Sequence, residues 1–197
     1  MKQACDQALE TLGNMRLSID PELNLPSRKL DLPPLHILQR LETMYAHAAQ
    51  QAGMSLTIDH PETAPANLRL DETRIQQILG NLIRNAILHS GGRTIRLSVQ
   101  LRPKDPALYN QDAVLWTVTD DGVGLSPVDA AALFEPFKRG ERATVDGSGL
   151  GLYIAHNTAT QLGGTLRVAP DQMTGTRFEL HLPVTDTSLL DGDTIFR

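Results

Sequence analysis

The stretch DETRIQQILGNLIRNAILHSGG, residues 71–92, constrains the fold of this chain more than any other segment. Its apolar residues recur at three- and four-residue steps, which places them on one helical face: Ile75, Ile78, Leu79, Leu82, Ile83 and Ala86. Asp71 is a suitable N-cap and Gly91 follows the last turn. A helix with this wide apolar stripe requires a second layer to pack against.

The second layer is predicted from short segments of alternating apolar residues. Strands are expected at 54–59, 94–101, 113–120, 165–170 and 175–183. Two further helices are expected at 35–53 and 149–162, the first ending at Gly53. The pattern predicts a mixed α/β domain with helices on one side of a largely antiparallel sheet.

Both ends of the chain differ from this domain. Residues 3–19 place Ala4, Ala8, Leu12, Met15 and Ile19 at helical steps, and four prolines between 20 and 34 favour an extended connection. We therefore expect a helical segment at 1–20, a linker at 21–30, the main domain at 31–183 and a tail at 184–197.

The composition of the chain limits its possible partners and cellular location. The net charge of -5 argues against nucleic acid as a partner. The single cysteine excludes an internal disulfide framework and fits a reducing compartment. No apolar run is long enough to insert into a membrane, and the polar N-terminus is unlike a signal peptide. A cytoplasmic chain is expected, whether alone or beside a membrane-bound sensor.

Two asparagines lie four residues apart at the edge of the helical stripe. Asn81 and Asn85 are neighbours on the helix surface, where a cleft wall would lie. An amide oxygen is a hard ligand suited to Mg²⁺, which binds few protein groups plus substrate phosphates. Ordinary hydrogen bonding to nearby backbone remains the alternative.

A carboxylate closes the predicted strand 113–120. Asp120 shares the alternation of Val114, Trp116 and Val118, so it ends a buried row and needs a hydrogen-bond donor. The amino group of adenine is such a donor, whereas guanine carries an oxygen at that position. Gly122 and Gly124 would let the backbone turn close to a flat ring, although a simple Asp-Gly turn also fits.

Glycines also precede the helix predicted at 149–162. Gly147, Gly149 and Gly151 remove side chains where backbone N–H groups and the helix dipole could meet a phosphate. A flexible loop that merely precedes a helix is the alternative. Upstream, Phe134 and Phe137 could anchor a polar loop whose Arg139 and Arg142 are candidates to reach phosphate oxygens, or are simply solvated.

The ordered series NLIRNAILHS, DDGVGL, LFEPF, GSGLGL and GTRFELHLP resembles the catalytic ATP-binding domain of bacterial sensor histidine kinases, over about residues 31–183. These belong to a superfamily shared with gyrase, Hsp90 chaperones and MutL. The resemblance implies a two-layer α/β sandwich that holds ATP and Mg²⁺ beneath a lid. It also implies a phosphoacceptor histidine domain and a downstream response regulator as partners.

The resemblance assigns roles by position. Asn85 matches the magnesium asparagine, Asp120 the adenine-binding aspartate and Thr176 the threonine that supports it. The expected nucleotide-binding residues are Asn81, Asn85, Asp120, Gly122, Gly124, Phe137, Gly147, Gly149, Leu150, Gly151 and Thr176, with Phe134 as a second aromatic at the base of the lid. Asn81, Arg139 and Arg142 are the candidate catalytic residues.

Two positions separate the possible activities. Hydrolysing relatives carry a glutamate where this chain has Asn81, and an amide cannot act as a general base. Kinases often carry a cation where this chain has Leu88. Either Arg139, Arg142 or Arg84 compensates for it, or nucleotide binding is weakened, and a non-catalytic scaffold with the same fold is therefore an alternative. A serine kinase of the anti-sigma-factor type is a further one. No histidine has the family's phosphoacceptor pattern, so the acceptor is expected in a missing segment or another chain.

Overall fold

The computed structural model describes residues 29–59, 67–125, 132–136, 149–169 and 174–184. Its elements, in chain order, are β1 (Leu30–Leu32), α2 (Pro34–Gln51), β2 (Ser55–Ile58), β3 (Leu68–Leu70), α3 (Glu72–His89), β4 (Thr94–Asp105), the short 3₁₀ helix η2 (Pro106–Leu108), β5 (Gln111–Asp120), α5 (Gly151–Gln161), β6 (Thr165–Val168) and β7 (Arg177–Pro183). The helix expected at 3–19 and residues 185–197 of the tail expected at 184–197 lie outside the described residues.

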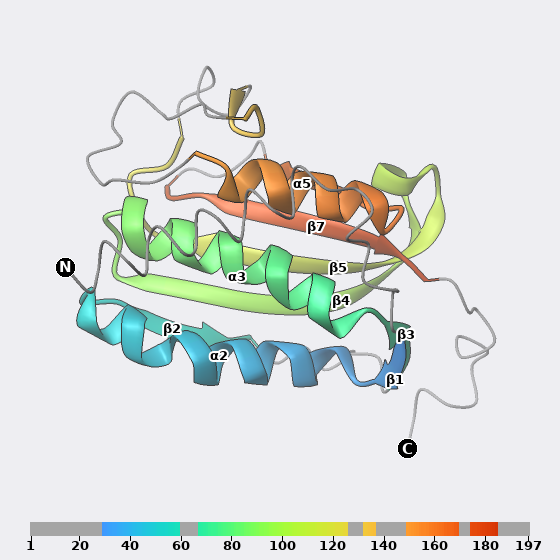
Figure 1. The fold of residues 1–197 in the computed structure, drawn as a ribbon, viewed down its shortest axis with the longest axis horizontal. Helices are drawn as coiled ribbons and strands as arrows, with labels where there is room; N and C mark the ends of the chain where they lie inside the picture. Colours follow the sequence, from blue (N-terminus) through green and yellow to red (C-terminus); the bar gives the residue numbers. More distant parts are fainter. Residues whose placement is uncertain (1–28, 60–66, 126–131, 137–148, 170–173, 185–197) are drawn as a thin grey trace.

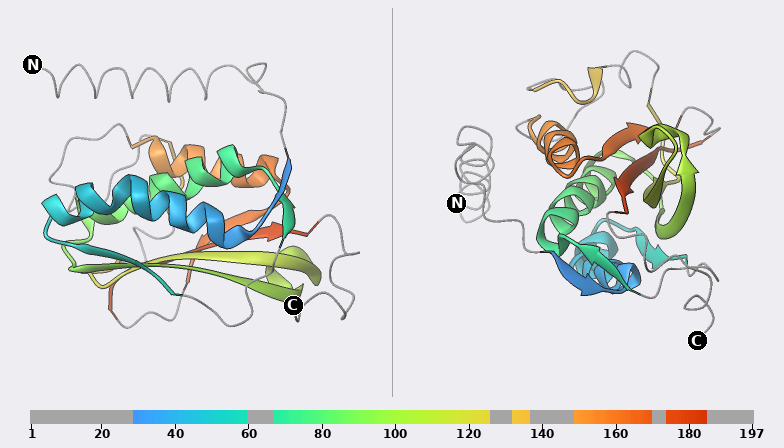
Figure 2. Two further views of the ribbon diagram at one scale, coloured as in Figure 1. Left: turned by 90° about the horizontal axis from the view of Figure 1, so that it is seen from below. Right: turned by 90° about the vertical axis from the view of Figure 1, so that its right-hand side faces the viewer.

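The fold has two layers. Helices α2, α3 and α5 lie side by side on one face of a five-stranded sheet (Figure 1), and the edge-on view of Figure 2 shows them all on the same side. The strand order is β2-β4-β5-β7-β6. Only β2 and β4 run parallel, while the other three pairs are antiparallel. The predicted mixed, largely antiparallel sandwich is confirmed.

A small second sheet was not expected. β1 pairs antiparallel with β3, with Leu30 opposite Leu70, so residues about 40 positions apart meet beside the N-termini of α2 and α3. Each strand has three residues, too few for alternation to be recognised in the sequence.

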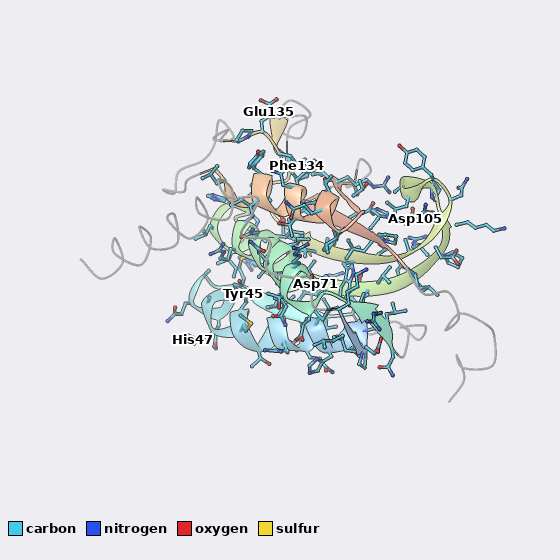
Figure 3. All side chains as sticks on the ribbon, turned by 45° about the vertical axis from the view of Figure 1, so that its right-hand side comes forward. Tyr45, His47, Asp71, Asp105, Phe134 and Glu135 are labelled. Atoms are coloured by element: carbon cyan, nitrogen blue, oxygen red, sulfur yellow. The ribbon has the colours of Figure 1, made fainter. Side chains whose placement is uncertain are left out.

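Helix α3 forms where the sequence predicts it. The Asp71 side chain accepts a hydrogen bond from the Arg74 N–H at 3.2 Å, which caps the helix N-terminus. Beyond its C-terminus, Gly91 has a φ of 64°, a left-handed conformation that glycine adopts without strain. The helix packs closely on α2, because Tyr45 of α2 lies directly against Gly80 (Figure 3).

The main core lies between the helices and the sheet. The apolar stripe of α3 is buried there, opposite alternate residues of the central strands such as Leu97, Trp116 and Leu180. Trp116 is completely buried in the middle of β5. The alternation that predicted β5 therefore marks its helix-facing side.

Polar groups are buried on the opposite face of the sheet. The β4–β5 hairpin carries an irregularity between Arg102 and Asp105, and η2 lies beside both β5 and β7. There the Asp105 carboxylate of β4 meets the His181 imidazole of β7, with Oδ2 and Nδ1 2.5 Å apart. Both side chains are almost completely buried. This pair joins residues 76 positions apart and was not predicted from the sequence.

Candidate nucleotide-binding site

Asp120 occupies the end of β5 on the helix-facing side. Its side chain is only 4% exposed. One carboxylate oxygen, Oδ1, accepts hydrogen bonds from the Gly122 N–H at 2.9 Å and the Thr176 N–H at 3.3 Å. Burial raises the pKa of Asp120 above its ordinary value, because removal from water penalises the charged form more than these two N–H donors favour it.

Thr176 supports Asp120 through its backbone. The Asp120 N–H donates to the Thr176 carbonyl at 2.9 Å, and the Thr176 N–H returns the bond to the carboxylate. Main-chain atoms of Thr176 therefore hold the carboxylate in place, while the nucleotide-binding role expected for this threonine stays a prediction. These contacts join β5 to the turn that precedes β7.

Three glycines let backbone segments meet around Asp120. A Cβ at Gly122 would collide with the Ser90 carbonyl, and one at Gly175 would collide with the Asp120 carbonyl. Gly175 and Gly124 also have positive φ values of 74° and 73°, where a side chain is strained. Three backbone segments therefore pack together here without room for added atoms: the end of β5, the end of α3 and the turn before β7.

A second carboxylate next to this junction was not singled out from the sequence. Asp121 Oδ1 accepts hydrogen bonds from the backbone N–H groups of Arg93, at 2.6 Å, and Thr94, at 2.8 Å. The bonds from Thr94 and Arg93 hold the pKa of Asp121 below its ordinary value. Asp121 thereby fastens the start of β4 to the end of β5. The Asp-Asp pair in the sequence was its only signal.

The two asparagines of α3 differ in their surroundings. Asn81 is buried and Asn85 is partly exposed. Asn81 Nδ2 donates to the Gly151 carbonyl at 3.1 Å, and Asn81 Oδ1 accepts from Arg84 Nη2 at 2.6 Å. The structure therefore brings Asn81 together with the first residue of α5, across 70 positions of sequence.

The metal-binding capacity of the described part of the chain is limited. Within it, no group of three or more His, Cys, Asp or Glu side chains is placed to hold a metal ion. Asn85 offers one neutral amide oxygen from a partly exposed position. This donor set fits Mg²⁺ that arrives with nucleotide phosphates, because such an ion keeps several waters and needs few protein ligands.

Helix α5 begins at the second run of glycines. Gly149 has a φ of 67°, Leu150 is buried, and Gly151 is the first helical residue. This backbone conformation is available to glycine without strain and lets the chain enter the helix sharply. The N–H groups of the first turn of a helix have no partners within the helix, so this end suits an anion.

The aromatic segment before the second glycine run lies beside α5. The ring of Phe134, which is labelled in Figure 3, stacks on His156 of α5, with the ring centroids 5.0 Å apart. The sequence suggested an anchoring aromatic here but not its histidine partner. Phe137, Arg139, Arg142 and Gly147 lie outside the described residues. Leu88, where a cation was considered, is 50% exposed on α3.

Within the described part of the chain, no helix combines the length and the apolar character needed to cross a bilayer.

Residues 70–186 match the family described as histidine kinase-, DNA gyrase B- and HSP90-like ATPases. The autoinducer 2 sensor kinase/phosphatase LuxQ of Vibrio cholerae is 36% identical over 147 residues, which cover 73% of this chain and 17% of LuxQ. The sensor-like histidine kinase SenX3 of Mycobacterium tuberculosis is 37% identical over 142 residues, 69% of this chain and 32% of SenX3. The chain thus spans less than a third of the length of either relative.

The fold is also similar to a solved structure, that of the Acinetobacter baumannii histidine kinase AdeS. The TM-score is 0.66 at 20% identity, over 89% of this chain and 77% of that one. At this identity the likeness concerns the fold alone.

Proposed function

Because the chain belongs to the family of histidine kinase-, DNA gyrase B- and HSP90-like ATPases, we propose that it is the catalytic ATP-binding domain of a sensor histidine kinase. Its reaction is transfer of the γ-phosphoryl group of ATP to a histidine in another segment or chain. The relatives named as sensor kinases support the kinase branch of the family. The observation that carries the proposal within the structure is the buried Asp120 carboxylate.

Asp120 recognises the adenine base in this proposal. The backbone N–H groups of Gly122 and Thr176 both donate to Oδ1, and among the described residues no backbone N–H donates to Oδ2. Oδ2 can therefore accept from an exocyclic amino group in a site of low dielectric, where such a bond is strong. Guanine presents an oxygen there, which a carboxylate repels. The close backbone packing at Gly122 and Gly175 keeps the carboxylate in place.

Asn85 and the start of α5 serve the phosphates. Asn85 supplies an amide oxygen to Mg²⁺, and the bound ion neutralises phosphate charge. The backbone N–H groups at Gly149, Leu150 and Gly151 are the expected donors to phosphate oxygens. Arg139 and Arg142 are proposed from the sequence as further phosphate ligands, and Phe137 as an aromatic neighbour of the nucleotide.

The transfer step requires no general base from this chain. The attacking group is a histidine imidazole, which is largely neutral near pH 7 and already carries a nucleophilic lone pair. The N–P bond forms as the bond from the γ-phosphorus to the bridging oxygen breaks, and ADP leaves. The chain contributes by positioning ATP and stabilising charge. An amide at position 81 agrees with this assignment, because a glutamate would be needed to activate water.

The first test compares nucleotides on the full chain. Asp120→Asn retains an amide oxygen for the Gly122 and Thr176 N–H groups but turns an NH₂ group toward the adenine amino group. We expect ATP affinity to fall about 10- to 100-fold, as loss of one hydrogen bond to a charged group predicts, while GTP loses less. Binding is measured by calorimetry with each nucleotide.

The matched control is Asp121→Asn, which removes the same charge one residue away but leaves an oxygen for the Arg93 and Thr94 N–H groups. It should leave the ATP to GTP ratio unchanged. Equal ATP affinity in Asp120→Asn and the natural chain would refute the assignment. Asn85→Ala, in turn, should abolish the gain in ATP affinity that Mg²⁺ provides.

The second test concerns the chemical step. The chain is incubated with radiolabelled ATP and a phosphoacceptor hairpin from a related sensor kinase, and the product is treated with acid. Phosphohistidine is lost in acid, whereas phosphoserine survives. Acid-stable label on the partner would favour the serine kinase alternative instead.

A non-catalytic scaffold remains a second candidate because of Leu88. This exposed apolar side chain stands where a phosphate-binding cation was considered, so phosphate contact at that position is lost. Calorimetry decides between the two candidates. Failure of the natural chain to bind Mg-ATP at millimolar concentration would favour the scaffold.

The proposed cellular context follows from the reaction. ATP is an intracellular substrate, and the lone cysteine of the chain fits a reducing compartment, so we place this domain in the cytoplasm. Its partners would be a phosphoacceptor histidine domain and a response regulator that receives the phosphoryl group. The net charge of -5 is unfavourable for nucleic acid.

A further inference from the structure

Helix α3 is joined to the start of α5 by a chain of two side-chain hydrogen bonds. Arg84 Nη2 donates to Asn81 Oδ1 at 2.6 Å, and Asn81 Nδ2 donates to the Gly151 carbonyl oxygen at 3.1 Å. The Asn81 side chain is 7% exposed, so both bonds are largely shielded from water. We call this the Arg84–Asn81–Gly151 relay.

The two end groups of the relay, the Arg84 guanidinium and the Gly151 carbonyl, determine how the Asn81 amide is oriented. A guanidinium has only donors and a carbonyl oxygen only accepts, so Asn81 must turn its oxygen to Arg84 and its NH₂ group to Gly151. An aspartate or glutamate at position 81 could accept from Arg84 but would place an oxygen against the Gly151 carbonyl. Of these three side chains, only the amide offers an acceptor to Arg84 and a donor to Gly151.

The bond from Arg84 is the stronger half of the relay. The Arg84 side chain is only partly exposed, and this partial removal from water lowers the pKa of its guanidinium. A hydrogen bond from a charged donor in such surroundings is shorter and stronger than a bond between neutral groups. Arg84 therefore restricts Asn81 to one amide orientation even before a ligand binds.

Resting on the function proposed above, we infer that Arg84 is a positioning residue that acts through Asn81 to hold the first turn of α5 against α3. Gly149, Leu150 and Gly151 carry the N–H groups assigned to phosphates, and Asn85, one helical turn after Asn81, carries the magnesium oxygen. The relay sets the separation of these two groups. The adenine side of the site, around Asp120, does not depend on it.

This division predicts which ligands respond to a change in the relay. In Arg84→Met, Asn81 loses its orienting donor, and ATP with Mg²⁺ should bind about tenfold more weakly, as loss of one such bond predicts. Adenosine, which lacks phosphates, should bind within twofold of the natural chain. Arg84→Lys retains a donor and should recover part of the lost affinity. Calorimetry on the full chain measures both ligands.

Three further variants sharpen the test. Asn81→Asp retains the acceptor for Arg84 but opposes the Gly151 carbonyl, so it should show the same selective loss of ATP affinity. The double variant Arg84→Met with Asn81→Asp should lose less than the product of the two single effects, because both remove one connection. Gln77→Met, one turn earlier on α3 and outside the relay, is the control and should bind both ligands normally.

The outcomes separate the relay from the function it serves. If the natural chain binds neither ATP nor adenosine, the proposed function fails and the positioning role fails with it. If the natural chain binds both, but Arg84→Met loses neither or loses both equally, the positioning role is overturned while the function stands. Where Arg84→Met does not fold, as judged by circular dichroism, Arg84→Lys and Asn81→Asp decide by the same ratio of ATP to adenosine affinity.

Discussion

The Asp105–His181 pair on the outer face of the sheet allows a quantitative test of what stabilises this fold. Their side chains are 4% and 3% exposed, and Asp105 also accepts a hydrogen bond from the Ala107 N–H at 2.9 Å. Replacing His181 leaves the buried Asp105 carboxylate with the Ala107 N–H as its remaining partner among those described, and breaking such a buried pair costs about 3–5 kcal/mol. We therefore expect His181→Leu to lower the free energy of unfolding by about 3 kcal/mol, or the melting temperature by about 6–12 °C.

The pH dependence of this loss provides a second measure. Burial raises the pKa of Asp105, but the hydrogen bonds from His181 and Ala107 and the charges of His181 and Arg167 outweigh it, so the net pKa lies below its ordinary value. A carboxyl group whose pKa is lowered on folding contributes stability above its unfolded pKa of about 3.9, and this contribution is lost as pH falls below that value. The natural chain should therefore lose more stability on acidification below about pH 4 than His181→Leu does.

The assay is urea unfolding followed by the fluorescence of Trp116, the single tryptophan, which is completely buried. Arg102→Ala, an exposed change on the same hairpin, is the control and should alter stability by no more than about 0.5 kcal/mol. A cost below about 1 kcal/mol for His181→Leu at pH 7 would refute the reasoning, since it would mean that Asp105 finds other partners or water at little expense.

Three further outcomes are expected from the junctions around the site. Gly175→Ala should both destabilise the chain and weaken ATP binding, because it adds left-handed strain and a collision with the Asp120 carbonyl. Gly53→Ala is the matched control, because Gly53 has a φ of 76° but open space around an added methyl group, so this variant should cost only the backbone strain of about 1 kcal/mol. Equal urea midpoints for Gly175→Ala and Gly53→Ala would contradict the argument. Asp71→Ala should lower stability by about 1 kcal/mol through loss of the N-cap of α3, measured by urea unfolding, without a change in ATP affinity. Asp121→Ala should reduce the stability of the chain at pH 7. Because the pKa of the Asp121 carboxyl group is lowered, its contribution to stability is lost when it is protonated, so the stability of the variant should depend less on acid than that of the natural chain. An unchanged dependence of stability on acid pH would count against this reasoning.

Local pattern was sufficient for the elements that carry the site. The period of α3 and its N-cap Asp71 are visible in the sequence because a helix face is defined by residues three and four apart. The buried position of Asp120 followed from the same alternation that buries Trp116 and Val118. Glycine spacing identified Gly122 as a place of close backbone approach, where an added Cβ would collide with the Ser90 carbonyl, since the lack of a side chain is a local property. The approach of a phosphate expected at Gly151 stays a prediction, because a Cβ there would meet only the Asn81 side chain at ordinary contact distances.

What the sequence could not reveal was which distant residues meet. It determined that Asn81 lies at the edge of a helical stripe, but only the packing of α3 against α5 brings its amide to Gly151. His181 gave no local signal, and its pairing with Asp105 arises because the β4–β5 hairpin and β7 come together across 76 residues. The physical reason is the same in both cases: periodicity is written into neighbouring residues, whereas a hydrogen bond between elements depends on the strand order and helix packing that form only when the whole chain folds.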